Sequence, residues 1–182
     1  MRQRLVFCLI LAALLALPVP GAAQHREPHA GVLAIGASAG VYVPGSEFHA
    51  AFTPEGFLEF YLTDRVSLRG MVGYANPSFD SGNAELRQTR GTASVLFNWE
   101  AGLWHPFVGF GGGFYYVQPR ASGEASGPAR TRAGAHAGIG IEYFATPKIT
   151  YKFEATYHLV QQGDLPGSPS GLALTAGLKK YF

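Results

Sequence analysis

The chain has 182 residues, and 14 lysines and arginines nearly balance 12 aspartates and glutamates, which gives no electrostatic case for nucleic-acid binding. Only 14% of the residues are charged, and the 24 glycines follow no triplet period, which excludes a collagen-like chain. The single cysteine, Cys8, lies in the apolar N-terminal stretch, so the exported chain is expected to lack disulfides, thiol catalysis and cysteine-type zinc sites.

Residues 1–23 are typical of a cleavable signal peptide. Arg2 and Arg4 form a positive start, an apolar stretch follows over 5–17, and small residues precede a predicted cleavage before Gln24. The apolar stretch is too short for a spanning helix, which needs about 20 residues. The alternative interpretation is a short membrane anchor.

Residues 24–30 (QHREPHA) are predicted to form a flexible exported lead-in. His25 and His29 are four residues apart, which would suit a metal only on a helix, and Pro28 argues against a helix. We therefore predict no metal site and no cofactor.

The rest of the chain alternates between apolar and polar residues with the period of a β-strand. In residues 148–160, Tyr151 and Phe153 share one apolar face, whereas Lys152 and Glu154 lie on the other. Eight such strands are predicted, at about 32–43, 48–62, 66–75, 89–99, 104–117, 131–145, 148–160 and 171–182.

The predicted connectors alternate in length. The short ones are 63–65, 100–103 and 146–148, and the long ones are 44–54, 76–87, 118–130 and 161–170. Tight turns on one rim and long loops on the other predict an all-β, eight-stranded, antiparallel up-and-down transmembrane barrel over residues 31–182, with both termini in the periplasm. A soluble barrel such as a lipocalin is the alternative, but its outer face would need more charge.

Charged side chains are predicted to meet inside the barrel. The tight turns set registers in which Glu59 faces Arg69, Glu142 faces Lys152, and His136 faces His158. Charges in a narrow lumen must be paired or hydrated, and inward glycines would leave room for long side chains, so we expect no open pore. The predicted interior network consists of Glu59, Arg69, Arg90, Arg132, His136, Glu142, Lys152, Glu154 and His158. The inward glycines are Gly109, Gly111, Gly113, Gly134, Gly138 and Gly140.

Aromatic residues gather near the rim that carries the tight turns. Because aromatic rings favour the bilayer interface, they are expected to form the periplasmic girdle. The girdle consists of Trp99, Trp104, Tyr143, Tyr151 and Phe182. Ligand stacking on the two tryptophans is the alternative interpretation.

Three segments carry a family resemblance: residues 105–113 (HPFVGFGGG), 138–144 (GIGIEYF) and 176–182 (AGLKKYF). Over residues 31–182 the chain resembles the small outer-membrane β-barrels, which include the membrane domain of outer membrane protein A and outer membrane protein X. The resemblance implies a bacterial outer-membrane location and recognition of the C-terminal strand, through Phe182, by the barrel-assembly machinery. Lys180 departs from the family pattern, which has an aromatic residue three places from the end.

The chain also resembles the eight-stranded lipid A deacylases near its end, but it departs from them where the chemistry would occur. Their His-x-Ser-Asn run corresponds to residues 158–161 here, where Val160 replaces the serine nucleophile and cannot attack an ester. The last strand also lacks the expected acidic partner. We therefore predict that the chain is not an enzyme.

Together these patterns predict a monomeric integral protein of the bacterial outer membrane, surrounded by outer-membrane lipids and lipopolysaccharide. Its role would be structural or a surface interaction carried by the long extracellular loops. Two alternatives remain: an ester hydrolase acting on lipid A, and a narrow pore or small-ligand carrier.

Overall fold

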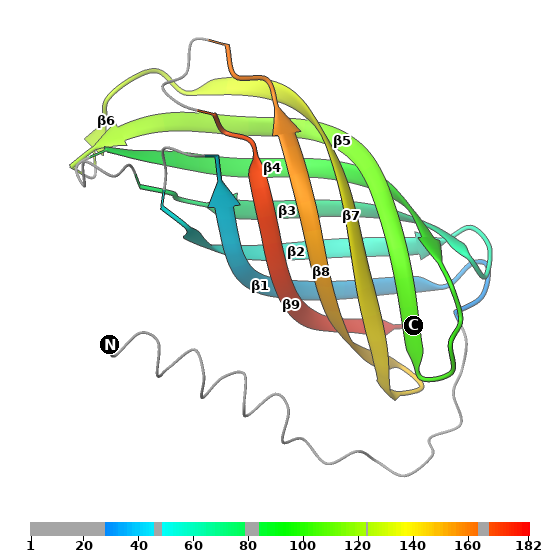
Figure 1. The fold of residues 1–182 in the computed structure, drawn as a ribbon. Coiled ribbons are helices and arrows are strands. Elements are labelled where there is room, and N and C mark those ends of the chain that lie inside the picture. Colours follow the sequence, from blue (N-terminus) through cyan, green and yellow to red (C-terminus); the bar gives the residue numbers. More distant parts are fainter. Residues whose placement is uncertain (1–27, 46–48, 79–83, 123, 164–167) are drawn as a thin grey trace, which may run out of the picture.

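The computed structural model describes residues 28–45, 49–78, 84–122, 124–163 and 168–182, which form one closed β-barrel (Figure 1). Within these ranges, no helix is long and apolar enough to cross a membrane. The predicted signal peptide over 1–23 lies outside the described residues.

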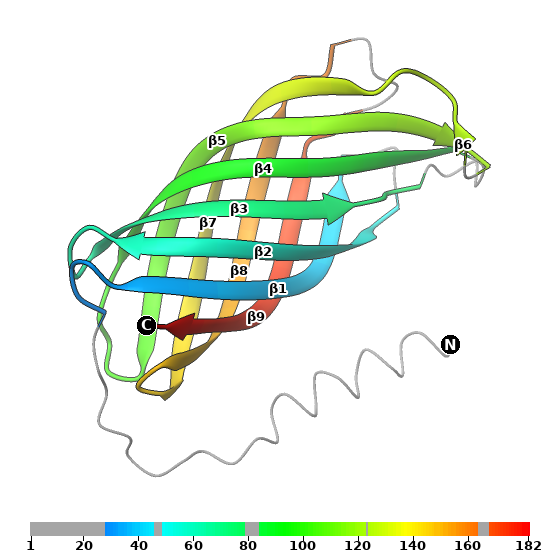
Figure 2. The ribbon, with the colours of Figure 1, turned by 180° about the vertical axis from the view of Figure 1, so that it is seen from behind.

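Eight antiparallel strands close the barrel, and a ninth of two residues extends one of its hairpins. Each long strand pairs with the next, and the first pairs with the last, so the predicted up-and-down barrel is confirmed (Figures 1 and 2). The strands are β1 Leu33–Pro44, β2 Ala51–Tyr61, β3 Val66–Ala75, β4 Ala84–Asn98, β5 Trp104–Ala121, β6 Glu124–Ala125, β7 Arg130–Thr146, β8 Ile149–Val160 and β9 Gly171–Tyr181.

The hairpin of β4 and β5 is longer than the sequence pattern predicted. The predicted strand 89–99 begins at Ala84, and the predicted strand 104–117 continues to Ala121, which pairs with Ala84. The polar residues of this extension form cross-strand pairs, among them Glu85 with Arg120. The predicted connector 118–130 was therefore too long, because residues up to 121 belong to β5, and β6 folds back on that strand end.

The apolar face of every long strand points outward. Phe153 and Tyr157 are 40% and 49% exposed, whereas Lys152 and Glu142 are 0% and 1% exposed. A soluble barrel requires the opposite arrangement, with the apolar face inside. The outward face therefore suits lipid, and the lumen holds the ionised groups.

Inward glycines permit close approach between neighbouring strands. At Gly40 a Cβ atom would collide with the backbone of Leu174 on β9, and at Gly73 it would collide with the guanidinium of Arg90. The ring of Phe107 covers Gly140, and the ring of Tyr115 covers Gly134. The space at these two glycines is therefore filled by aromatic rings rather than by the charged side chains that the sequence led us to expect there.

Candidate functional site

The half of the lumen nearer the tight turns, which is expected to face the periplasm, holds a cluster of six charged side chains, here called the inner charge cluster. Arg69 on β3 lies at its centre and donates to Glu59 Oε2 through Nε at 3.0 Å and through Nη2 at 2.8 Å. Its Nη1 donates to Glu154 on β8 at 2.9 Å, and Glu154 also accepts from Lys152. The cluster consists of Glu59, Arg69, Glu142, Lys152, Glu154 and Lys179.

Lys179 is a member that the sequence analysis did not name. Its Nζ lies 2.6 Å from Glu142 Oε1 and 3.3 Å from Glu59 Oε1, and it donates to the Tyr61 hydroxyl at 3.0 Å. The alternation of β9 placed Lys179 on the inward face, which is the signal that could have identified it. With it, three cations balance three carboxylates, and the side chains are 3% exposed or less except that of Glu154, which is 14% exposed.

Aromatic rings enclose the cations of the inner charge cluster. The Cζ atom of Arg69 lies 4.8 Å from the centroid of the Phe57 ring and 5.2 Å from that of Phe107. Lys152 Nζ lies 4.4 Å from the centroid of Phe57. Cation–π attraction therefore adds to the ion pairs and fixes where the cationic groups sit.

A layer of apolar and tyrosine side chains closes the tight-turn end of the lumen, beyond the inner charge cluster. Tyr181 donates from its hydroxyl to Glu142 Oε2 at 2.7 Å, and its ring stacks on Phe144 at a centroid distance of 5.5 Å. The same buried layer consists of Val32, Ala34, Tyr61, Phe144 and Tyr181. Of the predicted lead-in, residues 28–30 are described: Pro28 is buried, and the Ala30 amide donates to Asp64 Oδ1 at 3.3 Å.

The other half of the lumen, which is nearer the long connectors, contains a separate ion pair. Arg90 on β4 reaches Glu55 on β2, with Nη2 2.6 Å from Oε1, and the same nitrogen donates to Thr53 at 2.7 Å. Ser38 donates to the other carboxylate oxygen of Glu55 at 3.1 Å. The Arg90 guanidinium lies over the Tyr42 ring, with 5.4 Å between Cζ and the ring centroid.

His136 and His158 lie opposite each other on β7 and β8, and both are buried in the same outer half. Their ring centroids are 5.6 Å apart. The hydroxyl of Ser94 lies 2.7 Å from His136 Nε2, and that of Tyr115 lies 2.8 Å from His158 Nδ1. Among the described residues, no group of three or more histidine, cysteine or acidic side chains is placed to hold a metal ion.

Arg132 is not brought into either charged group. Its guanidinium lies beside the backbone of Gly163 at the outer end of the barrel, and its Nε and Nη2 atoms have no hydrogen-bond partner among the described residues. The eight other predicted network residues lie inside the lumen, divided between the inner charge cluster, the Arg90 pair and the two histidines.

Apolar groups also close the outer end of the lumen. Leu86, Tyr115, Val117 and Val160 form one buried cluster there. Tyr42 donates from its hydroxyl to the carbonyl of Pro169, at 2.6 Å, and thereby ties the loop before β9 to the barrel wall. The lumen is thus filled from the layer at the tight turns, through both charged groups, to this outer cluster.

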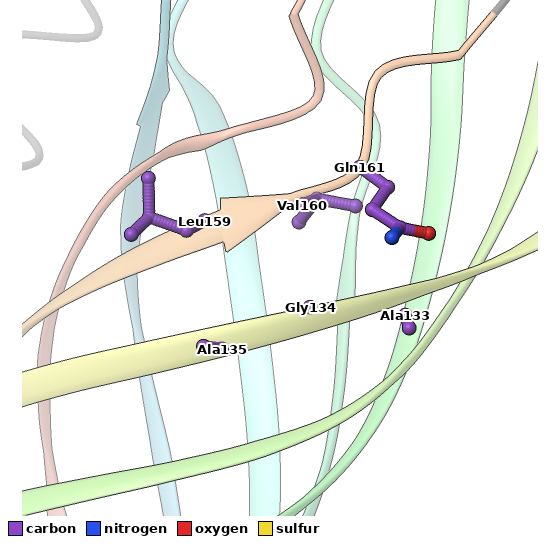
Figure 3. A pocket seen from close by; sticks show the side chains of 6 residues that line it. All are labelled: Ala133, Gly134, Ala135, Leu159, Val160 and Gln161. Carbon is purple, nitrogen blue, oxygen red and sulfur yellow. The ribbon is translucent and has the colours of Figure 1, made fainter.

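The residues that correspond to the deacylase motif do not form a catalytic arrangement. His158 is fully buried in the lumen against Tyr115, and the Val160 side chain also contributes to the buried outer cluster. Figure 3 shows the hollow between the ends of β7 and β8, which is lined by Ala133, Gly134, Ala135, Leu159, Val160 and Gln161. Its lining offers no hydroxyl or thiol nucleophile and no carboxylate.

The predicted girdle residues lie at the rim that carries the tight turns. Trp104 pairs with Tyr143, which pairs with Tyr151, so three aromatic residues follow one another across β5, β7 and β8. The rings of Trp104 and Tyr143 are 4.7 Å apart, and Trp99 is 47% exposed. Phe182 is 65% exposed, and the outward Lys180 lies over its ring at 5.1 Å. This arrangement suits the membrane interface.

Comparisons with known proteins agree with this architecture. The family model described as "Outer membrane protein beta-barrel domain" matches residues 9–179 of the chain. The chain is similar to the N-terminal barrel of Pseudomonas aeruginosa OprF, with 14% identity, a TM-score of 0.63, and coverage of 85% of this chain and 100% of that one.

Two further solved structures share the fold. Neisserial surface protein A is 17% identical with a TM-score of 0.68, and the match covers 86% of this chain and 100% of that one. The outer membrane enzyme PagL is 14% identical with a TM-score of 0.50, and the match covers 81% of this chain and 98% of that one. No curated protein sequence matches the chain significantly.

Proposed function

The chain belongs to the outer membrane protein β-barrel family, and on that premise we propose that it is a non-transporting, non-enzymatic barrel that acts through its extracellular rim. Its location is the bacterial outer membrane. The role is structural or a surface interaction, carried by the connectors between β1 and β2, β3 and β4, β5 and β7, and β8 and β9.

The filled lumen is the observation that supports this proposal most strongly. A transport path would have to pass the layer of Tyr61, Phe144 and Tyr181, then the inner charge cluster, then the layer of Leu86 and Val117. Eight strands enclose a space that side chains can fill, whereas aqueous channels occur in wider barrels. Opening it would separate buried ion pairs, which costs several kcal/mol.

The outer rim is where the chain differs most from a minimal barrel. The β4–β5 hairpin continues past the end of β3 at Ala75, and β6 is attached to its tip (Figure 1). Arg87 and Arg120 lie on this extension, and Arg130 begins the next strand. A paired, polar extension of this kind is a suitable scaffold for contacts outside the cell.

Single-cysteine labelling tests the orientation, because the exported chain is expected to contain no cysteine of its own. Ser126→Cys, in the connector between β5 and β7, is expected to react with a membrane-impermeant maleimide on intact cells. Thr63→Cys, in the turn between β2 and β3, is the matched control and is expected to react only after the outer membrane is permeabilised. The opposite labelling pattern would overturn the proposal.

Conductance and lipid analysis test the two alternatives. We expect no discrete channels when the purified barrel is added to planar bilayers, and no released acyl chain when it is incubated with lipid A and the lipid is examined by mass spectrometry. Stable single-channel steps would replace the proposal with a pore, and a deacylated product that Val160→Ala leaves unchanged but His158→Ala removes would replace it with a hydrolase.

A further inference from the structure

One lipid-facing wall carries an apolar groove that begins near the middle of the barrel. Its floor follows the register across three strands, with Gly70 on β3 opposite Ala93 on β4, and Ala93 opposite Gly112 on β5. Leu58, Val72 and Phe114 stand beside this floor, and the hollow measures about 840 Å³. We call it the wall groove, and Figure 2 shows the wall of β2 to β5 in which it lies.

The wall groove continues toward the extracellular rim. A second hollow of about 260 Å³ shares Gly56 and Val72 with the first and reaches Tyr74 on β3 and Thr89 on β4. Gly91, which lies between the two levels on β4, has no atom within 4 Å of the position of a Cβ. The two hollows therefore form one smooth path along the outer face.

A cation stands at the outer end of this path. Arg87 is exposed on the outward face of β4, and its Cζ lies 5.7 Å from the centroid of the Tyr74 ring. Thr89 pairs with Tyr74 on one side and with Tyr116 on the other, and tyrosines at such a level mark the membrane interface. Arg87 is one step farther out along the same face, at the level of lipid head groups.

The spacing fits one leaflet of a membrane. Arg87 lies four positions before Gly91 along β4, and four residue steps in a strand tilted by about 40° rise about 10 Å along the membrane normal. Half of the apolar band of an outer-membrane barrel is about 12 Å. The groove and the cation are therefore spaced as the acyl chain and the head group of an outer-leaflet lipid are.

The charge of Arg87 has no acidic partner among the described residues. The nearest carboxylate along β4 belongs to Glu85, which accepts a hydrogen bond from Asn76 at 2.8 Å and lies opposite Arg120 in the register. Placing a second barrel against this wall would bury the Arg87 guanidinium without a counter-ion, which is costly. A lipid phosphate would instead supply one.

We propose that the wall groove is a binding site for one phosphorylated, saturated lipid of the lipid A class. An acyl chain lies along Gly70, Gly91 and Gly112, and a phosphate accepts hydrogen bonds from Arg87. The inference rests on the extracellular position of this rim in the proposed function. If it is correct, the barrel holds an outer-leaflet lipid at the base of its protruding hairpin.

The opposite wall provides an internal control. A hollow of similar size, about 800 Å³, is lined by Ala39, Ala155 and Ala176 among other residues. Toward the outer end of this hollow, the outward-facing residues of β7, β8, β9 and β1, such as Val43 and Leu159, include no lysine or arginine, because Arg130 and Arg132 of β7 belong to its other face. This hollow offers space for an acyl chain but no cation for the head group. Comparing it with the wall groove therefore separates the contribution of the acyl-chain space from that of the cation.

Native mass spectrometry of the purified barrel with added lipid A tests the proposal. We expect one lipid A to stay bound to the wild-type protein. Arg87→Gln should weaken its retention about 10-fold, because a charge-assisted hydrogen bond is lost. Gly91→Leu should weaken it similarly, because the side chain fills the groove. Arg65→Gln, at the periplasmic turn, and Ala155→Leu, in the opposite hollow, are the matched controls and should leave retention unchanged.

Each variant is first shown to be folded by its heat-modifiable migration in a gel. Equal retention by Arg87→Gln and Arg65→Gln would overturn the proposal, as would equal loss with Ala155→Leu. Retention of phosphatidylglycerol as strong as that of lipid A would exclude the proposed lipid class, and protein dimers that Gly91→Leu abolishes would show a second copy in the groove. The maleimide experiment on Ser126→Cys reports separately on the proposed orientation, so the two failures are distinguishable.

Discussion

Replacing Arg69 with methionine removes the central cation of the inner charge cluster while keeping an unbranched side chain of similar length. Arg69 makes three hydrogen bonds, two to Glu59 and one to Glu154, and lies between two aromatic rings. The substitution leaves three carboxylates with two cations. Both bonded carboxylates keep another cation, Lys179 for Glu59 and Lys152 for Glu154.

Removing one partner of a buried ion pair costs about 3–5 kcal/mol. Because the remaining cations still compensate part of the charge, we expect Arg69→Met to lower the free energy of unfolding by about 3 kcal/mol, at the lower end of this range. Because the free energy of unfolding falls by about 2 kcal/mol per molar urea, the urea concentration at the unfolding midpoint should fall by about 1.5 M. The transition is measured in lipid vesicles, by heat-modifiable gel migration and by the fluorescence of Trp99 and Trp104. The exposed Arg65→Met is the matched control and should change stability by less than about 0.5 kcal/mol.

A double variant separates charge imbalance from lost packing. Arg69→Met combined with Glu59→Gln leaves two intact pairs, Lys179 with Glu142 and Lys152 with Glu154. Its cost should therefore be about 1–2 kcal/mol less than the sum of the two single variants. If Arg69→Met costs less than about 1 kcal/mol, or if the costs of the two single variants simply add, the inner charge cluster does not stabilise the barrel through coupled ion pairs.

Three further changes test other parts of the structure. Glu142→Gln removes the acceptor charge for Lys179 and should cost about 3 kcal/mol of unfolding free energy, measured in the same urea assay; a cost near zero would contradict the ion pair. Gly40→Val places a branched side chain against the backbone of Leu174 and should abolish the heat-modifiable folded band, whereas Gly91→Val should fold. Trp104, as the single tryptophan of a Trp99→Phe variant, should be strongly quenched by lipids brominated near the head group, and quenching only at the bilayer centre would contradict the girdle.

The alternation of apolar and polar residues was sufficient to predict the barrel, because a period of two fixes which face each residue occupies. The turn lengths also predicted that Glu59 stands opposite Arg69, and the structure has this register. The alternation and the turn lengths do not predict contacts between strands that are not neighbours in the sheet. Glu154 reaches Arg69 across the lumen, and such a contact depends on barrel curvature rather than on register.

The outer ends of the strands were the least predictable part. Residues such as Arg87 and Gln118 resemble loop residues in composition, yet they pair with each other in the extended hairpin. Outside the membrane both faces of a strand contact water, so the apolar residues that alternate with polar ones within the membrane are no longer needed. The backbone hydrogen bonds between neighbouring strands continue, although the sequence pattern that identifies a strand disappears. Arg132 also could not be placed from the sequence, because its surroundings are set by loop residue Gly163.

The position of Lys179 connects the charged interior with closure of the barrel. Its strand, β9, pairs with β1, and β1 separates it from β2, which carries Glu59. Lys179 reaches Glu59 across β1 because the inward residues there are small, notably Gly36, whose missing side chain also admits the Phe57 ring. This ion pair can form only when the first and last strands have met. The inner charge cluster therefore stabilises the closed barrel relative to an open sheet, in addition to the hydrogen bonds between β1 and β9.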